Sequence, residues 1–205
     1  MAYPPQESIS LLADLIQAAS VEDPLDLASR LIARFGSLRA VLSAPSEQLL
    51  PAVGGDDRQA TILLAAGRLA ETFLADAVGA KPVDRRDPAF VDFIRWHFRD
   101  VRRERLVLVY FDRDERLLFA EVVSEGSVCA VETDIRAILR GALQANAASL
   151  VLAHNHPSGD FRPSEEDLRN TAIARSLSSK LGVTISDHLI VTPDAIYSMC
   201  RGELL

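Results

Sequence analysis

One short stretch constrains the fold more than any other: the apolar run of residues 148–153, which leads directly into His154 and His156. A short run of branched apolar residues is typical of a buried strand. Side chains two positions apart on a strand point to the same face, so we expect the two imidazoles to converge on one point. Asn155 is expected on the opposite face, where its amide suits a structural hydrogen bond.

The residues after this strand can return a carboxylate to the two histidines. Residues 157–163 contain prolines and a glycine and predict an ordered turn. Ser164 and Asp167 then mark a helix start, with Ser164 as the N-cap and Asp167 in the first turn. Each feature alone has a plainer explanation, because His-x-His pairs arise by chance and Asp167 suits an ordinary capping box near the helix dipole.

Taken together, His154, His156 and Asp167 offer the donor atoms of a zinc site. Three protein ligands leave a fourth tetrahedral position for water, which is the arrangement of a catalytic zinc rather than a structural one. The sequence therefore predicts Zn2+ as a cofactor, bound by these three side chains.

The spacing of His-x-His, ten residues and Asp resembles the JAMM motif of the JAB/MPN metalloproteases. The letters His-Asn-His-Pro-Ser-Gly from His154, followed by Pro-Ser-x-x-Asp from Pro163, are similar to the bacterial RadC branch (UPF0758-like), which is named for DNA repair. The similarity extends over most of the chain. It implies an α/β fold, an MPN (JAB1/MPN-like) sheet sandwiched by helices, preceded by a small all-α domain resembling a helix-hairpin-helix.

The resemblance also implies further catalytic residues. Family members use a glutamate at the start of the first sheet strand as general base and acid, and Glu104 is the matching position. Glu121, Glu125 and Glu132 are alternatives, and Glu104 could instead pair with a neighbouring arginine. Ser164 matches the family serine that stabilises the oxyanion of the tetrahedral intermediate, but it could also serve only as the helix cap.

Residues 1–80 are expected to form the helical, helix-hairpin-helix-like domain, with Gly54 and Gly55 in the hairpin. Such a module usually holds DNA phosphates on N–H groups at a helix N-terminus. Here Asp56 and Asp57 lie at the expected contact, and residues 1–84 contain 6 basic and 11 acidic side chains. Because like charges repel, we favour a packing or protein-interaction role and keep DNA binding as the alternative.

Residues 81–89 predict a linker, and residues 90–205 the RadC-type MPN (JAMM) domain. This domain begins with an expected amphipathic helix from Phe90 to Val101, in the most basic part of the chain, which is the first place to look for contacts with a nucleic acid. The arginines of this part are Arg95, Arg99, Arg102, Arg103 and Arg105. Helices are predicted at 133–146 and 164–181, and strands at 106–111, 117–123, 128–131, 148–153, 183–191 and 195–199. His188, on one of the later strands, could support a metal ligand or be a core histidine.

The composition narrows the range of partners and compartments. A net charge of −7 and an isoelectric point near 5.1 argue against a surface built throughout for phosphate backbones. The two cysteines, Cys129 and Cys200, are too few for a disulfide framework and lack zinc-finger spacing. The first residues carry no signal-peptide pattern, and no apolar run approaches the roughly 20 residues of a membrane span. We expect a cytoplasmic protein without a membrane partner.

Three functions remain open from the sequence. The first is a zinc metallopeptidase, an isopeptidase-like amide hydrolase acting on a peptide or protein. The second is a DNA-associated repair or recombination factor, and the third is a non-catalytic MPN scaffold. The intact ligand set disfavours a scaffold, since scaffolds of this fold typically have degraded motifs. An HNH nuclease is excluded because His154, Asn155 and His156 are adjacent on one expected strand.

Overall fold

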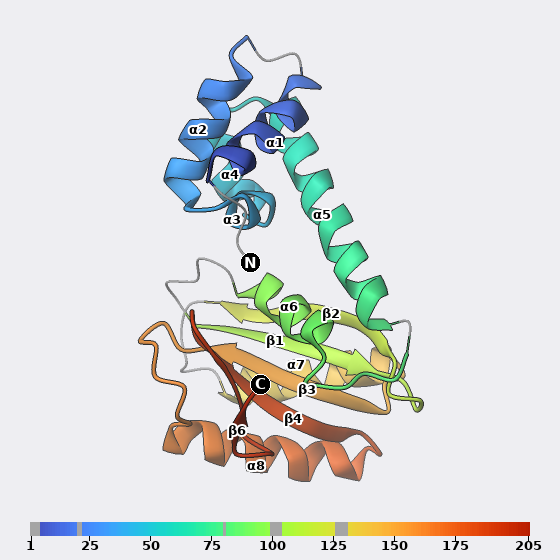
Figure 1. Ribbon diagram of the computed structural model, residues 1–205. Coiled ribbons are helices and arrows are strands. Elements are labelled where there is room, and N and C mark those ends of the chain that lie inside the picture. The colour runs from blue at the N-terminus through green and yellow to red at the C-terminus, as the bar shows by residue number, and fades with distance from the viewer. Residues whose placement is uncertain (1–4, 20–21, 80, 99–103, 126–130) are drawn as a thin grey trace. The chain divides into compact units, whose positions relative to one another are not determined.

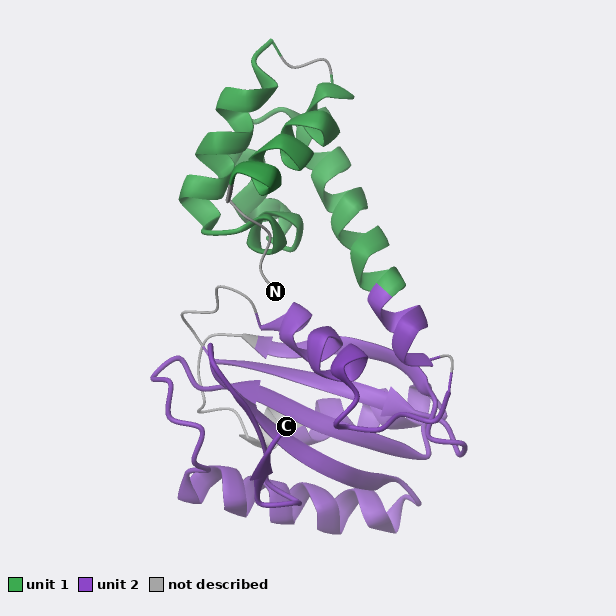
Figure 2. Cartoon of the chain, viewed as in Figure 1, with its two compact units in different colours: residues 1–73 green, residues 74–205 purple. Residues whose placement is uncertain are grey.

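The computed structural model describes residues 5–19, 22–79, 81–98, 104–125 and 131–205 (Figure 1). The chain divides into two compact units, Met1–Phe73 and Leu74–Leu205 (Figure 2). The first unit is helical, and the second is built on a β-sheet with helices packed against it.

The first unit consists of short helices packed around a small apolar core. They are α1 (Pro5–Gln17), α2 (Pro24–Phe35), α3 (Leu38–Leu42), α4 (Ser46–Ala52) and the part of α5 (Asp57–Gly79) that ends at Phe73. Side-chain caps define several helix ends: Asp23 accepts from the Asp26 N–H, and Ser37 accepts from the Ala40 N–H. Gly36 ends α2 in the left-handed conformation, with φ of 88°. The core includes Leu12, Ile16, Leu31, Leu49 and Leu63.

Within the described residues, the sheet of the second unit has six strands in the order β2-β1-β3-β4-β5-β6. They are β1 (Arg105–Phe111), β2 (Leu117–Glu125), β3 (Ser149–Asn155), β4 (Thr184–Val191), β5 (Ile196–Ser198) and β6 (Glu203–Leu204). The β3–β4 pair is parallel, whereas the other neighbours are antiparallel. The central strand β3 is buried along its whole length, which agrees with its apolar sequence.

Alternation along the strands separates the core of this unit into two layers, one on each face of the sheet. The layer under α6 (Pro88–His97) contains Phe90, Phe93, Val107, Val109 and Val151. The layer under α7 (Val131–Gln144) and α8 (Glu165–Lys180) contains Leu108, Ile138, Leu150, Leu152 and Ala174. Figure 1 shows α6 and α7 on opposite sides of the sheet. Helices therefore cover both faces, so the predicted α/β sheet flanked by helices is confirmed, with a helical region before it.

Several element boundaries differ from those expected. Val131, predicted to end a strand, begins α7, and residues 128–130 lie outside the described part of the chain. The short strand β6 was not predicted; it pairs with β5 through Tyr197 and Leu204. Two residues give too little periodicity to be recognised in sequence, and this strand is defined by its pairing partner.

The segment 81–87, expected to be part of a linker, packs against the sheet of the second unit. The Val83 N–H donates to the Glu115 carbonyl at 2.9 Å. Arg85 is buried, forms an ion pair with Glu115 at 2.9 Å and lies 4.1 Å from the centre of the Phe111 ring. A buried, paired arginine of this kind is stabilised by both its carboxylate and the aromatic face.

Among the described helices, none combines the length and apolar character that a bilayer crossing requires.

Candidate metal centre

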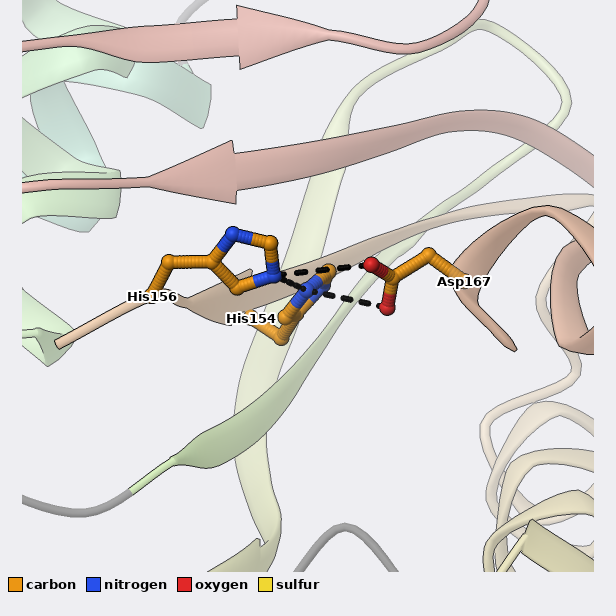
Figure 3. A group of neighbouring side chains, drawn as sticks. All are labelled: His154, His156 and Asp167. Atoms are coloured by element: carbon orange, nitrogen blue, oxygen red, sulfur yellow. Dashed lines mark hydrogen bonds and ion pairs between the residues drawn. The ribbon is translucent and has the colours of Figure 1, made fainter. Parts of the chain in front are cut away.

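Three donor side chains meet where β3 ends (Figure 3). The Nε2 atoms of His154 and His156 lie 2.8 Å apart. Asp167 Oδ1 lies 3.2 Å from His154 Nε2, and Asp167 Oδ2 lies 3.4 Å from His156 Nε2. The structure thus brings into one cluster the three residues that the sequence predicts as zinc ligands.

The sheet holds the two histidines at this position. In β3, His154 is paired with Leu106 of β1 on one side and with Ile190 of β4 on the other. Just past β3, the His156 N–H donates to the Val191 carbonyl at 2.9 Å. Asn155 lies between them, and its Oδ1 accepts from the Arg105 N–H at 2.8 Å, so it binds the start of β1. The amide therefore has the structural hydrogen bond expected of it.

The start of α8 positions the carboxylate of Asp167. Ser164 donates to Asp167 Oδ2 twice, from its backbone N–H at 2.8 Å and from its hydroxyl at 2.6 Å. The Asp167 N–H donates back to Ser164 Oγ at 3.1 Å, which completes a capping box. These bonds hold Oδ2 and leave Oδ1 facing His154. In this arrangement the Ser164 hydroxyl hydrogen points at Asp167, and its role toward an oxyanion stays a prediction.

Behind His154, a chain of hydrogen bonds returns to the backbone of Asp167. His154 Nδ1 lies 2.7 Å from His188 Nε2, His188 Nδ1 is hydrogen-bonded to Thr171 Oγ1, and Thr171 Oγ1 donates to the Asp167 carbonyl at 2.6 Å. Because Thr171 uses its single hydroxyl hydrogen on that carbonyl, His188 Nδ1 must donate to Thr171. A neutral His188 then accepts at Nε2. His154 therefore carries its hydrogen on Nδ1 and turns the lone pair of Nε2 toward the cluster.

His156 has the same tautomer for a separate reason. Its Nδ1 lies 2.7 Å from the Asp160 carbonyl oxygen, and a carbonyl can only accept, so Nδ1 carries the hydrogen. The loop that supplies this carbonyl is held by Arg162, whose hydrogen bonds to the Asp160 side chain lower the pKa of that carboxyl to about 2. His156, when neutral, therefore also turns a lone pair toward the cluster.

Three electron-pair donors thus face one another at 2.8 to 3.4 Å, and only a proton or a cation among them removes their mutual repulsion. A tetrahedral zinc with bonds of about 2.0–2.1 Å holds its ligand atoms about 3.3 Å apart. The observed separations are close to that value, and two imidazoles with one carboxylate are a common zinc-binding set. The residues present therefore fit a zinc ion.

In the absence of a cation, protons take over the same role. Burial opposes ionisation of Asp167, but the hydrogen bonds from Ser164 and from His154 or His156 carrying a proton on Nε2 together outweigh it and hold the pKa of Asp167 below its usual range. The hydrogen bond to Asp167 raises the pKa of His156 above its ordinary value. Burial lowers the pKa of His188 well below its ordinary value, which keeps that imidazole neutral in the relay.

Glu104, the predicted proton shuttle, lines the same hollow as His154 and Asp167. It directly precedes β1, and its side chain is partly buried. Among the alternatives, Glu121 accepts a hydrogen bond of 2.6 Å from the Tyr110 hydroxyl and is not one of the residues that line this hollow. The side chains of Glu125 and Glu132 lie outside the described residues. Of Glu104 and Glu121, Glu104 is the one that lines the hollow shared with His154 and Asp167.

In the N-terminal hairpin, the carboxylate of Asp56 already binds the backbone N–H groups at the start of α5. Asp56 Oδ1 accepts from the N–H groups of Arg58 and Gln59 at 2.8 and 3.2 Å. A phosphate bound at the start of α5 would have to displace this carboxylate. In the arginine-rich region, Arg95 of α6 donates to the Asp194 carbonyl and Arg105 of β1 donates to the His97 carbonyl, while Arg99, Arg102 and Arg103 lie outside the described residues.

The relay through Thr171 was not predicted from sequence. A signal was present, because Thr171 follows Asp167 by four residues and so lies on the same side of a helix. Its partner His188 comes from a strand far along the chain, which only the fold brings near.

Of the cysteines, Cys200 is exposed beside Arg175, and Cys129 lies outside the described residues.

A central sheet with helices on both faces, a preceding helical region and a His-x-His…Asp cluster at a strand end are the features of a JAB domain protein. Residues 85–204 match the family model described as the RadC-like JAB domain. The chain therefore belongs to the RadC-like JAB domain family.

Relatives named UPF0758 protein agree with this assignment. One from Paraburkholderia xenovorans is 34% identical over 180 residues, which make up 88% of this chain and 71% of that protein. One from Burkholderia mallei is 35% identical over 88% of this chain and 65% of its own length. One from Syntrophotalea carbinolica is 33% identical over 97% of this chain and 88% of its own length. The chain thus spans about two thirds of the length of some of these relatives.

The pairing of Asp167 with His156 predicts a pH-dependent contribution to the stability of the metal-free protein. The pKa of Asp167 is lowered, so its contribution is present above about pH 4 and is lost as the pH falls through the folded-state value. The pKa of His156 is raised, so its contribution is complete below about pH 6.5 and is lost as the pH rises through the folded-state value.

In chelator-treated protein, we therefore expect the free energy of unfolding of the wild type to exceed that of Asp167→Asn most between about pH 4 and pH 6.5. Urea unfolding followed by circular dichroism measures this difference at each pH. Asp194→Asn, which changes an exposed carboxylate, is the control. A difference that stays constant from pH 4 to pH 9 would contradict the pairing.

Proposed function

We propose that this protein is a zinc-dependent hydrolase of the JAMM type that cleaves amide bonds in a peptide or protein. The proposal rests on one observation: three electron-pair donors converge at zinc-like separations, and hydrogen bonds to Nδ1 fix the tautomers of the two imidazoles. Membership in the RadC-like JAB family supports it, since a hydrolase is compatible with such a domain.

His154 Nε2, His156 Nε2 and Asp167 Oδ1 would hold the ion, because Asp167 Oδ2 is bonded to Ser164. When bound, zinc supplies a Lewis acid that polarises a carbonyl and lowers the pKa of water to about 7. The relay from His188 to His154 keeps the imidazole in the tautomer that can bind a metal.

Glu104 is the residue that we propose moves protons in the reaction. Its position at the rim of the hollow, beside His154, allows its carboxylate to accept a proton from the attacking water and deliver it to the leaving amine. Ser164 is the proposed donor to the oxyanion. To act in this way, its hydroxyl must rotate from Asp167 Oδ2 toward the substrate, while its backbone N–H keeps the carboxylate in place.

The other two functions have less support. A non-catalytic scaffold does not require two histidines held in metal-binding tautomers. DNA binding through the N-terminal hairpin requires a phosphate to compete with Asp56 for the N–H groups at the start of α5. A gel shift with duplex and branched DNA at physiological salt tests this alternative directly.

The relay behind His154 predicts how zinc affinity depends on a residue that does not bind the metal. Wild-type protein should bind about one zinc per chain, and His154→Ala should not. Thr171→Val removes the acceptor for His188 Nδ1–H, so His188 can carry its hydrogen on Nε2 instead. His188 Nε2–H then donates to His154 Nδ1, and the hydrogen of His154 moves to Nε2, the nitrogen that would bind the metal. We expect zinc affinity to fall by roughly 10- to 100-fold, measured by competition with a chromophoric chelator.

Thr171→Ser is the matched control, because it retains the hydroxyl and should retain most of the affinity. If Thr171→Val binds zinc as tightly as the wild type, the relay does not set the tautomer. If the wild type fails to bind zinc at neutral pH, the proposed function itself is wrong.

Glu104→Gln should separate catalysis from metal binding. The substitution leaves the three ligands intact but removes the proton acceptor, so zinc content should be unchanged while turnover falls by about 10²- to 10⁴-fold. To identify substrates, we would compare newly formed protein termini across the proteome in cells expressing the wild type or Glu104→Gln. Termini present only with the wild type identify substrates.

Glu121→Gln is the control for this experiment, since it changes a competing glutamate that is bonded to Tyr110. If the new termini disappear in Glu121→Gln but persist in Glu104→Gln, the proton shuttle is Glu121 and the assignment to Glu104 is wrong.

A further inference from the structure

A hollow beside the metal centre runs inward between α7 and α8. Leu106 of β1 and Leu152 of β3 form its floor, on the face of the sheet that these two helices cover. Ile135 and Ile138 of α7 form one wall, and Ala174 of α8 lies on the other. The hollow opens at Glu104, His154 and Asp167.

The lining of the hollow combines polar residues, which include Glu104, Asp167, Ser124 and Asn170, with apolar side chains from β1, β3, α7 and α8. Glu104, just before β1, lies two residues ahead of Leu106, and His154 lies two residues after Leu152 on β3. Strand alternation therefore puts these polar and apolar side chains on one continuous face. Arg105 also borders the hollow, but its guanidinium donates to the His97 carbonyl at 2.8 Å. A charged group entering the inner part would lose its hydration without an ionic partner, which is unfavourable.

The size of the hollow sets the size of its occupant. Its volume is about 100 Å³. An apolar cavity of about 150 Å³ is known to bind benzene, which has six carbons, so this space corresponds to roughly four carbon atoms. The side chains of leucine and isoleucine have that size, whereas an aromatic ring exceeds it.

We propose that this hollow is a specificity pocket for a branched aliphatic side chain, leucine or isoleucine, on the residue whose carbonyl is attacked. This inference rests on the proposed function and adds the class of substrate. The carbonyl that is attacked must lie at the cluster. The side chain nearest to that carbonyl is the one on the same residue, whose Cα is bonded to the carbonyl carbon. The hollow borders the cluster and offers such a side chain an apolar space to enter.

Hydroxamates test the pocket without knowledge of the natural substrate, because the hydroxamate group binds zinc and its acyl side chain occupies the place of the substrate's. We would measure the dissociation constants of N-acetylleucine, N-acetylglycine and N-acetylglutamate hydroxamates for the zinc-loaded wild-type protein by calorimetry. The leucine compound should bind about 10- to 50-fold more tightly than the glycine compound, since burial of its methylene and methyl groups is favourable. The glutamate compound should gain nothing over glycine.

Two substitutions change the pocket in opposite directions. Ala174→Leu fills it, so the preference for leucine over glycine should disappear while the glycine compound binds as before. Ile138→Ala enlarges it, so N-acetylphenylalanine hydroxamate should bind more tightly than to the wild type. Ala172→Leu makes the same change as Ala174→Leu at an exposed position on the same helix and should leave the preference unaltered.

The outcomes separate this inference from the function on which it rests. Equal affinity of the wild type for the leucine and glycine compounds would overturn the pocket while leaving a zinc site open to ligands. A preference for leucine that survives Ala174→Leu and is unchanged by Ile138→Ala would place the side chain elsewhere and also overturn it. A zinc-loaded protein that binds none of the hydroxamates would instead contradict the proposed hydrolase, because its metal would have no open position.

Discussion

Two imidazole lone pairs and a carboxylate lie within 2.8 to 3.4 Å of one another in this protein, and such a cluster is stable only with positive charge among its members. The cluster is not a consequence of loose packing, because each member is held from behind. His188 fixes His154, the Asp160 carbonyl fixes His156, and the capping box at Ser164 fixes Asp167. These supports leave all of the lone pairs directed inward, which is the arrangement that a cation-binding site requires.

The sheet and the second helix layer make this convergence possible. The central strand β3 carries His154 next to its last residue, and its parallel neighbour β4 contributes His188 on the same face. Helix α8 packs through Ala174 against that face, which places the first turn of the helix, and with it Asp167, over the strand end. Thr171 joins these elements, since it accepts from His188 and donates to the backbone of Asp167. Loss of that one hydroxyl would therefore affect both His154 and Asp167, although Thr171 is not itself a member of the cluster.

The ligand cluster could be predicted because its signals are local. His154 and His156 lie at the end of a distinct apolar run, and the Ser164 cap predicts the start of the helix that carries Asp167. The helical region and the sheet flanked by helices were likewise evident in hydrophobic periodicity. The contact of His188 with His154 spans 34 positions and depends on parallel pairing of β3 with β4, which periodicity does not specify. Strand β6 and the packing of Arg85 on Phe111 were missed for the same reason, since tertiary contacts define them.

X-ray absorption at the zinc edge on the zinc-loaded wild-type protein tests the central claim most directly, because it reports the atoms bound to the ion. We predict a four-coordinate zinc with only nitrogen and oxygen neighbours at about 2.0–2.2 Å and the outer-shell signal of two imidazoles. His156→Ala should lose one imidazole from that signal. A sulfur neighbour at about 2.3 Å, which would indicate a cysteine, or a spectrum without imidazole would contradict the account.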